Sequence, residues 1–186
     1  MKSLLLAGGR SSRMGRDKAL IEVGGVACIA RVASALAAAG CEPIRIAVAQ
    51  PEDVERYGSV MPDGLDVEWV LDAVTHAGPI EAVIEALTDP MVADSDSIQL
   101  CPVDVPWVTA DLFFELEKTL GSGDLLAIPA DPQRAHPLLA RVRPSIASKI
   151  ADDRRPLHVQ FSELEHSTLL TEAAILRNVN TPDDLN

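Results

Sequence analysis

The alternation of short apolar runs with helix-like segments is the feature that most constrains the fold of this chain. Buried strands are short and apolar, whereas helices are longer and carry recognisable end signals. The expected strands are Ser3–Ala7, Ile44–Ala49, Asp66–Leu71 and Ser97–Cys101, followed by less regular ones near Leu125–Pro129, Pro137–Arg143 and Asn178. The expected helices are Val26–Ala39, Pro51–Tyr57, Pro79–Leu87 and a segment capped by Thr109 that runs to about Leu120. This order predicts an α/β fold with a single doubly wound, mainly parallel sheet and helices on both faces.

The length of 186 residues fits one domain, residues 1–186, because each of two domains would be too small to bury a sufficient hydrophobic core. Apolar residues make up 47% and aromatic residues only 3%, so the core must be aliphatic. The three cysteines, Cys28, Cys41 and Cys101, have no metal-ligand spacing and are expected to be small core residues in a reducing, cytoplasmic setting. The longest apolar stretch is interrupted by Arg31, so no membrane segment is expected.

The charge of the chain is unevenly distributed. The formal net charge is −12, which argues against binding of a nucleic acid polymer because phosphate contacts need clustered basic side chains. Residues 1–50 nevertheless hold seven basic and three acidic side chains. The amino-terminal part is therefore the place where a small anion is expected to bind.

The loop after the first strand concentrates this positive charge. It runs from Leu6 to Lys18 and contains three glycines together with Arg10, Arg13 and Arg16. Glycines let backbone N–H groups approach phosphate oxygens, so the loop is predicted to hold a triphosphate. It is neither a P-loop nor a dinucleotide fingerprint. A solvated loop without function is the alternative, and the clustering of four cations in an acidic protein favours the phosphate site.

Two aspartates follow later strands, at the sheet edge where ligands bind in such folds. Asp104 lies between Pro102 and Pro106, and we predict that it binds Mg²⁺, which takes one or two carboxylates plus phosphate oxygens. A turn or capping role is the alternative, but Thr109 already caps the next helix. Asp72 is as readily explained as a turn residue, and Gly78–Pro79 as ordinary helix entry or as a pocket wall.

No side chain presents itself as a nucleophile or base. Ser11 and Ser12 have no neighbouring base, and the four histidines lack a carboxylate or cysteine at ligand spacing. His136 and His158 are therefore expected to be structural or exposed. Covalent catalysis is not supported.

The loop and three later motifs together resemble the molybdenum cofactor guanylyltransferases, within the nucleotidyltransferases that have a nucleotide-diphospho-sugar-transferase-like Rossmann fold. The matching motifs occur in the family's order over nearly the whole chain. They are Leu6-Ala7-Gly8-Gly9 with Arg13-Met14-Gly15 and Asp17-Lys18, Gly78-Pro79-Ile80 behind Asp72, Cys101-Pro102-Val103-Asp104-Val105-Pro106, and Asn178-Val179-Asn180-Thr181-Pro182-Asp183-Asp184-Leu185.

The resemblance implies Mg²⁺-dependent transfer of GMP from GTP to the molybdopterin cofactor, with release of pyrophosphate, and contact with proteins of the same pathway. Lys18, Arg13 and Asp104 are the implied catalytic residues, Asp104 is the implied metal ligand, and Asn180 is an additional site residue. The implied nucleotide-binding residues are Leu6, Ala7, Gly8, Gly9, Lys18, Asp72, Gly78 and Asp104.

Two departures from the family pattern concern which nucleotide base the site would select. The family's asparagine after the second strand is absent from Ala47–Gln50, so its contact with the nucleotide is either missing or replaced by Gln50. The family's second glycine after Gly-Pro is Ala82. Cytidylyl transfer to the same cofactor, or nucleotidyl transfer to another small phosphorylated acceptor, is thus the main alternative. A catalytically silent nucleotide-binding module is the alternative from another class.

Overall fold

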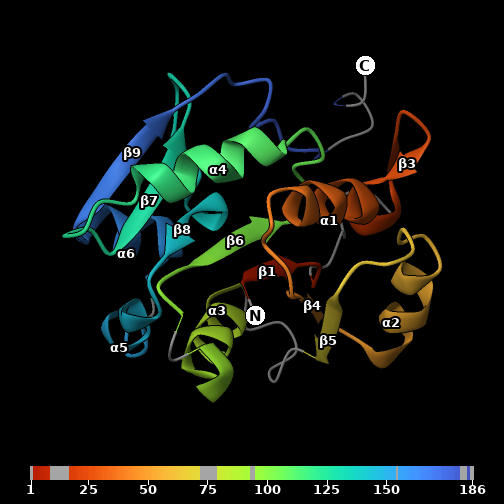
Figure 1. Ribbon diagram of the computed structural model, residues 1–186, viewed down its shortest axis with the longest axis horizontal. Helices are drawn as coiled ribbons and strands as arrows, with labels where there is room; N and C mark the ends of the chain where they lie inside the picture. The colour runs from red at the N-terminus through yellow and green to blue at the C-terminus, as the bar shows by residue number, and fades with distance from the viewer. Residues whose placement is uncertain are drawn as a thin grey trace.

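A seven-stranded sheet forms the centre of the computed structural model, which describes residues 2–8, 17–71, 79–92, 95–153, 155–180 and 184. The strands lie in the order β5-β4-β1-β6-β8-β7-β9 (Figure 1). Their bounds are β1 Ser3–Leu6, β4 Ile44–Val48, β5 Val67–Leu71, β6 Ile98–Pro102, β7 Leu126–Ala130, β8 Arg141–Val142 and β9 His166–Leu170. Only β8 runs antiparallel to its neighbours, so the predicted mainly parallel sheet is confirmed.

Helices cover both faces of this sheet, as predicted. Their bounds are α1 Cys28–Ala38, α2 Pro51–Gly58, α3 Pro79–Thr88, α4 Ala110–Thr119, α5 Ala147–Ile150 and α6 Leu157–Glu163. Figure 1 shows α1 and α4 above the sheet and α3 below it. Each face has its own core, because alternate residues of a strand point to opposite sides. Leu5 packs with α1, α2 and α4, whereas Leu4 and Leu6 pack with α3, α5 and α6.

Several element boundaries differ from the prediction. Val26–Ala27 is not helical: it is β3, paired with β2 at Glu22–Val23, and α1 begins only at Cys28. The predicted strand Pro137–Arg143 is instead the 3₁₀ helix η3, Pro137–Leu139, followed by the two-residue β8. The predicted strand at Asn178 is wrong, because residues 177–180 are irregular, and the last strand is β9.

The cysteines and the aliphatic core agree with the sequence. Cys28, Cys41 and Cys101 are buried and free, and burial raises the pKa of each thiol. Phe113 and Phe161 are the two largest fully buried side chains, and otherwise aliphatic residues fill both cores. In the described part of the chain, no helix is long and apolar enough to cross a membrane.

The strand order changes direction at β1, which pairs with β4 on one side and with β6 on the other. Leu6 and Pro102 are register partners, so the segments that follow β1 and β6 leave the sheet side by side. Open α/β sheets bind their ligands in the crevice outside such a switch point. The fold therefore brings Gly8, Lys18 and Asp104 to the same place.

Candidate active site

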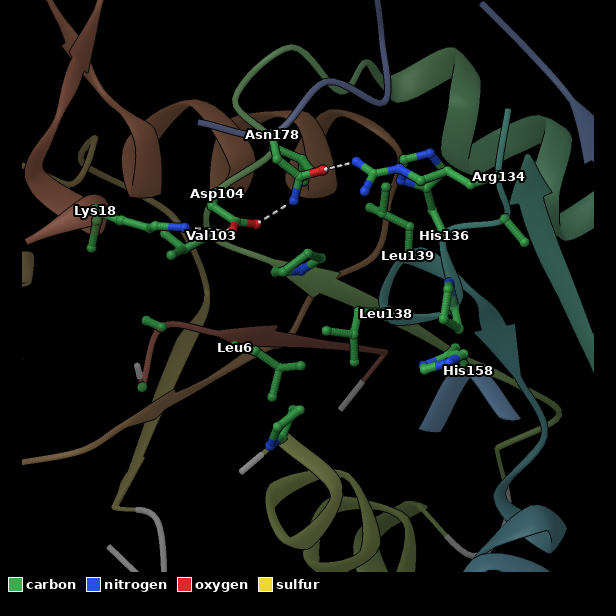
Figure 2. Close-up of a pocket in the computed structure, with 18 of the residues that line it drawn as sticks. Leu6, Lys18, Val103, Asp104, Arg134, His136, Leu138, Leu139, His158 and Asn178 are labelled. Carbon is green, nitrogen blue, oxygen red and sulfur yellow. Dashed lines mark hydrogen bonds and ion pairs between the residues drawn. The ribbon is translucent and has the colours of Figure 1, made fainter. Parts of the chain in front are cut away.

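A cavity of about 780 Å³ opens at this switch point. Leu6, at the end of β1, lines it together with Ala7 and Gly8, and Pro102, at the end of β6, lines it together with Val103 to Val105. Figure 2 shows Leu6, Val103 and Asp104 on this side. Residues 134–139 and α6 form the far wall. The lining thus combines chain segments from both halves of the sequence.

Lys18 is the central cation of the described part of this cavity. It lies in the 3₁₀ helix η1, Lys18–Leu20, and its Nζ is 3.0 Å from Asp104 Oδ2 and 2.8 Å from Asn180 Oδ1. The Lys18 and Asp104 side chains are 24% and 20% exposed to solvent. The pair is therefore ordered by direct contact and still reachable by a ligand.

A polar chain continues from Asp104 along the cavity wall. Asn178 Nδ2 donates to Asp104 Oδ1 at 3.1 Å, and Asn178 Oδ1 accepts from Arg134 Nη2 at 3.1 Å (Figure 2). Lys18, Asp104, Asn178 and Arg134 thus form one row of alternating donors and acceptors. Two cations, one at each end, flank the carboxylate.

The carboxyl-terminal segment is anchored so that its two asparagines reach this row. Val179 is fully buried, and its N–H donates to the Asp104 carbonyl at 2.8 Å. Arg177 lies 4.3 Å above the Trp107 ring, a cation–π contact beside the same turn. With Val179 anchored in this way, Asn178 bonds to Asp104 and Asn180 bonds to Lys18, so both asparagines reach the Lys18–Asp104 pair.

Helix α2 holds the residue before Lys18. Asp17 caps η1 through the Ala19 N–H at 3.1 Å, and its other oxygen accepts from Tyr57 Oη at 2.8 Å and Arg56 Nη2 at 2.9 Å. Burial, followed by the hydrogen bond to Asp17, raises the pKa of the Tyr57 hydroxyl. Asp17 thereby ties the start of η1 to the protein core.

We expect Tyr57→Phe to lower the free energy of unfolding by about 1.5 kcal/mol, because it removes a hydrogen bond to a charged group and keeps the ring in place. Urea unfolding followed by circular dichroism measures the change. An unchanged midpoint would show that Arg56 alone is enough to hold Asp17.

Asp131 and His136 form a second ordered pair at the far end of the cavity. Asp131 Oδ2 lies 2.8 Å from His136 Nε2, and the two side chains are only 9% and 8% exposed. The hydrogen bond from His136, followed by that from the Gln133 N–H, lowers the pKa of Asp131 to about 2. His136 is therefore a wall residue with a carboxylate partner, which was not predicted from its spacing in the sequence.

The lowered pKa predicts a pH effect on stability. Asp131 has a pKa of about 2 when folded and an ordinary value of 3.8, so its carboxylate stabilises the fold above pH 3.8. This contribution is lost as the pH falls through 3.8 towards 2. Asp131→Asn should therefore destabilise the protein at about pH 7 and have a smaller effect at about pH 3, as measured by urea unfolding. An equal effect at both pH values would contradict the assignment.

The structure brings together most of the predicted site residues that it describes. Leu6, Ala7, Gly8, Lys18 and Asp104 line the cavity, and Asn180 bonds to Lys18. Four predicted site residues lie outside the described residues: Gly9, Arg13, Asp72 and Gly78. Gln50 directly precedes α2, is exposed, and is not among the described residues that line the cavity.

Sequence reasoning missed the far wall. From the sequence, Asn178 is predicted only as a strand residue and as part of the carboxyl-terminal motif, and no role is predicted for Arg134. His136 is buried and hydrogen-bonded and His158 is exposed, as expected, and both also line the cavity. The Asp131–His136 spacing of five residues was the available signal, because a tight turn can bring such residues together.

The described residues offer a divalent metal ion only part of a ligand set. No group of three or more His, Cys, Asp or Glu side chains gathers anywhere in the described ranges. Asp104 supplies carboxylate oxygen and Asn180 amide oxygen close to the same ammonium group. Hard oxygen donors of this kind suit Mg²⁺, which commonly completes its shell with substrate phosphates and water. The residues present fit a metal ion that arrives with a nucleotide.

A doubly wound sheet with a lysine, a carboxylate and amides at its switch point defines an enzyme of the nucleotide-binding α/β class. Comparison with known proteins narrows this class. The chain belongs to the MobA-like NTP transferase family, whose domain matches residues 3–159, and it is a nucleotidyltransferase.

Similar proteins extend the match beyond that domain. The chain is 32% identical to a probable molybdenum cofactor guanylyltransferase of Synechococcus elongatus, over 98% of this chain and 94% of the relative. It is 29% identical to one from Mycobacterium ulcerans, over 100% and 91%. The crystal structure of molybdopterin-guanine dinucleotide biosynthesis protein A from Archaeoglobus fulgidus shares the fold, with a TM-score of 0.74, 23% identity and coverage of 100% and 95%. The family resemblance drawn from the motifs is confirmed.

Proposed function

We propose that this protein transfers GMP from GTP to the molybdopterin cofactor and releases pyrophosphate, with Mg²⁺ as the metal. Relatives named as molybdenum cofactor guanylyltransferases match the chain over nearly its whole length, which supports the substrates. The observation that carries the proposal is the contact of Lys18 with both Asp104 and Asn180 at the end of β1. This cluster joins three motifs that lie far apart in the sequence.

The reaction needs no base from the protein. A phosphate oxygen of the acceptor attacks the α-phosphorus of GTP, and the bond from that phosphorus to the oxygen bridging to the β-phosphate breaks. An ionised phosphate is already a nucleophile, so the reaction needs none from the protein. The described cavity lining contains one serine, Ser162, and its hydroxyl donates to the Val159 carbonyl at 2.8 Å. Positioning and charge neutralisation are then the main sources of rate enhancement.

The chain's own residues have distinct parts in this step. The Gly8 backbone and the Lys18 ammonium group hold the triphosphate, and Lys18 stabilises the negative charge that develops as pyrophosphate leaves. Asp104 holds Lys18 in place and, with Asn180, supplies oxygen ligands. Bound Mg²⁺ would supply Lewis-acid stabilisation of the phosphate oxygens. Arg13, Asp72 and Gly78 are further proposed nucleotide contacts.

The test is a competition between nucleotides. The purified protein is incubated with Mg²⁺, an equimolar mixture of the four nucleoside triphosphates and the molybdenum cofactor, and the dinucleotide product is identified by mass spectrometry. We expect the guanine dinucleotide together with pyrophosphate. The cytosine dinucleotide would overturn the choice of GTP, and no product in the presence of active cofactor would favour a silent binding module.

Two controls make the assay decisive. Omitting Mg²⁺ and adding a chelator should abolish product formation if the metal is required. Delivery of the labile cofactor by proteins of its own pathway should raise the rate without changing the product. An equal rate of product formation with and without the chelator would refute the proposed requirement for Mg²⁺.

A further inference from the structure

The two ends of the cavity differ in chemistry. Lys18 lies at one end, whereas Arg134 and His158 lie at the other (Figure 2), and Gly8 is part of the lining. Between them the wall carries Asp104 and Asn178 on one side and apolar residues that include Leu6 elsewhere. The proposed reaction joins two substrates in one site, and the end with Lys18 accounts for only the nucleotide phosphates. The second end therefore has the space and position for the acceptor.

Arg134 is held in place from two directions. Asp131 Oδ1 accepts from the backbone N–H groups of Gln133 at 2.7 Å and Arg134 at 3.0 Å, and the Asp131 N–H donates to the Arg134 carbonyl at 3.0 Å. The side chain is fixed separately, through Asn178 Oδ1. That bond uses one of the five N–H groups of a guanidinium, whose planar fork matches a phosphate. Arg134 is thus an oriented, exposed arginine on the cavity wall.

The surroundings of Arg134 suit a flat ring. Leu138 and Leu139 belong to η3 directly after His136, and His158 faces the same end of the cavity from α6 (Figure 2). Leu139 is buried, so this part of the wall is a firm apolar surface. An imidazole beside leucine side chains offers a face for stacking and an edge for a hydrogen bond. A cation next to such a surface favours a ligand with a phosphate at one end and a heterocycle at the other.

We propose that Arg134 binds the phosphate of the acceptor, a phosphomonoester attached to a flat heterocycle, and that Leu138 and His158 flank that ring. The inference rests on the proposed function and assigns its second substrate site. Asn178 bonds to both Arg134 and Asp104, so the acceptor phosphate would lie on one side of Asp104 and the nucleotide phosphates, held by Lys18, on the other. This is the arrangement that in-line attack requires.

The kinetic test separates the two substrates. Arg134→Ala should raise KM for the cofactor about tenfold, because a bidentate charged contact is lost, and leave the Kd for Mg·GTP, measured without acceptor, within about twofold. Arg134→Lys should recover part of the loss, since it keeps the charge but not the fork. Lys118→Ala is the matched control, because Lys118 is an exposed cation of α4 that pairs with Glu115. It should change neither constant.

A binding measurement keeps this inference distinct from the proposed function. Equilibrium dialysis of the cofactor without nucleotide reports its binding to wild-type and Arg134→Ala protein without any turnover. Weaker binding by the variant supports the acceptor site even if the nucleotide transferred is not GMP. An unchanged cofactor KM in an active variant, equal cofactor binding by the two proteins, no binding by either, or a matching rise in the Kd for Mg·GTP would each overturn the assignment of Arg134.

Discussion

Asp104→Asn is expected to reduce dinucleotide formation by about 10²- to 10³-fold. Asp104 holds Lys18, which stabilises the charge that develops as pyrophosphate leaves, and a loss of this size is typical when such stabilisation is removed. The change keeps the size of the side chain and an oxygen for Asn178, but removes the negative charge beside Lys18. Steady-state turnover with saturating Mg²⁺ and both substrates measures the effect. The Val179 anchor should persist, because it uses the backbone carbonyl of residue 104.

Stability measurements show whether that loss is chemical. The Lys18–Asp104 pair is partly exposed, so breaking it should cost at most about 1 kcal/mol of folding free energy. Asp63→Asn is the matched control, because Asp63 is an exposed loop aspartate far from β6 in the sequence. Full activity in a folded Asp104→Asn protein would refute the roles proposed for this carboxylate.

The sheet could be predicted from sequence because each local signal agreed with the fold. The apolar run at Ser3–Leu6 is buried on both faces, as a central parallel strand requires, and Thr109 accepts from the Leu112 N–H at the start of α4. Parallel strands place their carboxyl ends at one edge, so Gly8 and Asp104 could be assigned to a common site without coordinates. Here pattern and topology gave the same answer.

The errors have physical causes. Val26 and Ala27 share the composition of the helix that follows, so only their pairing with β2 shows that they are strand residues. β9 was missed because it is an edge strand with polar, half-exposed residues and no apolar run. The strand predicted near Asn178 is a coil segment, in which Val179 is buried as an anchor and not as part of a sheet.

The far wall of the site could not be derived because it depends on contacts between distant segments. Arg134 and Asn178 are 44 residues apart, and Asn178 and Asp104 are 74 apart. The count of charged residues predicts a single anion-binding region, within residues 1–50. The structure shows a second cation beyond Asp104, drawn from the acidic part of the chain. A local count of charge could not reveal that arrangement.

Lys18→Met is the second substitution with a large expected effect. Methionine keeps an unbranched apolar stem in η1 but removes the ammonium group that contacts Asp104 and Asn180. Removing one partner of a charged, hydrogen-bonded contact costs about 2–3 kcal/mol in binding, so the Kd for Mg·GTP should rise by about 30- to 150-fold. Calorimetric titration of Mg·GTP into the protein, without acceptor, measures this constant directly.

The pattern across variants distinguishes a phosphate contact from a purely structural lysine. Lys18→Met should weaken GTP binding and leave cofactor binding unchanged, the reverse of the effect expected at Arg134, whereas Lys118→Met should change neither. Lys18→Met combined with Asp104→Asn should cost less than the two single losses together, because each single change leaves the other residue without its charged partner. Strictly additive losses, or normal GTP affinity in the Lys18 variant, would show that Lys18 and Asp104 do not act on the nucleotide as a unit.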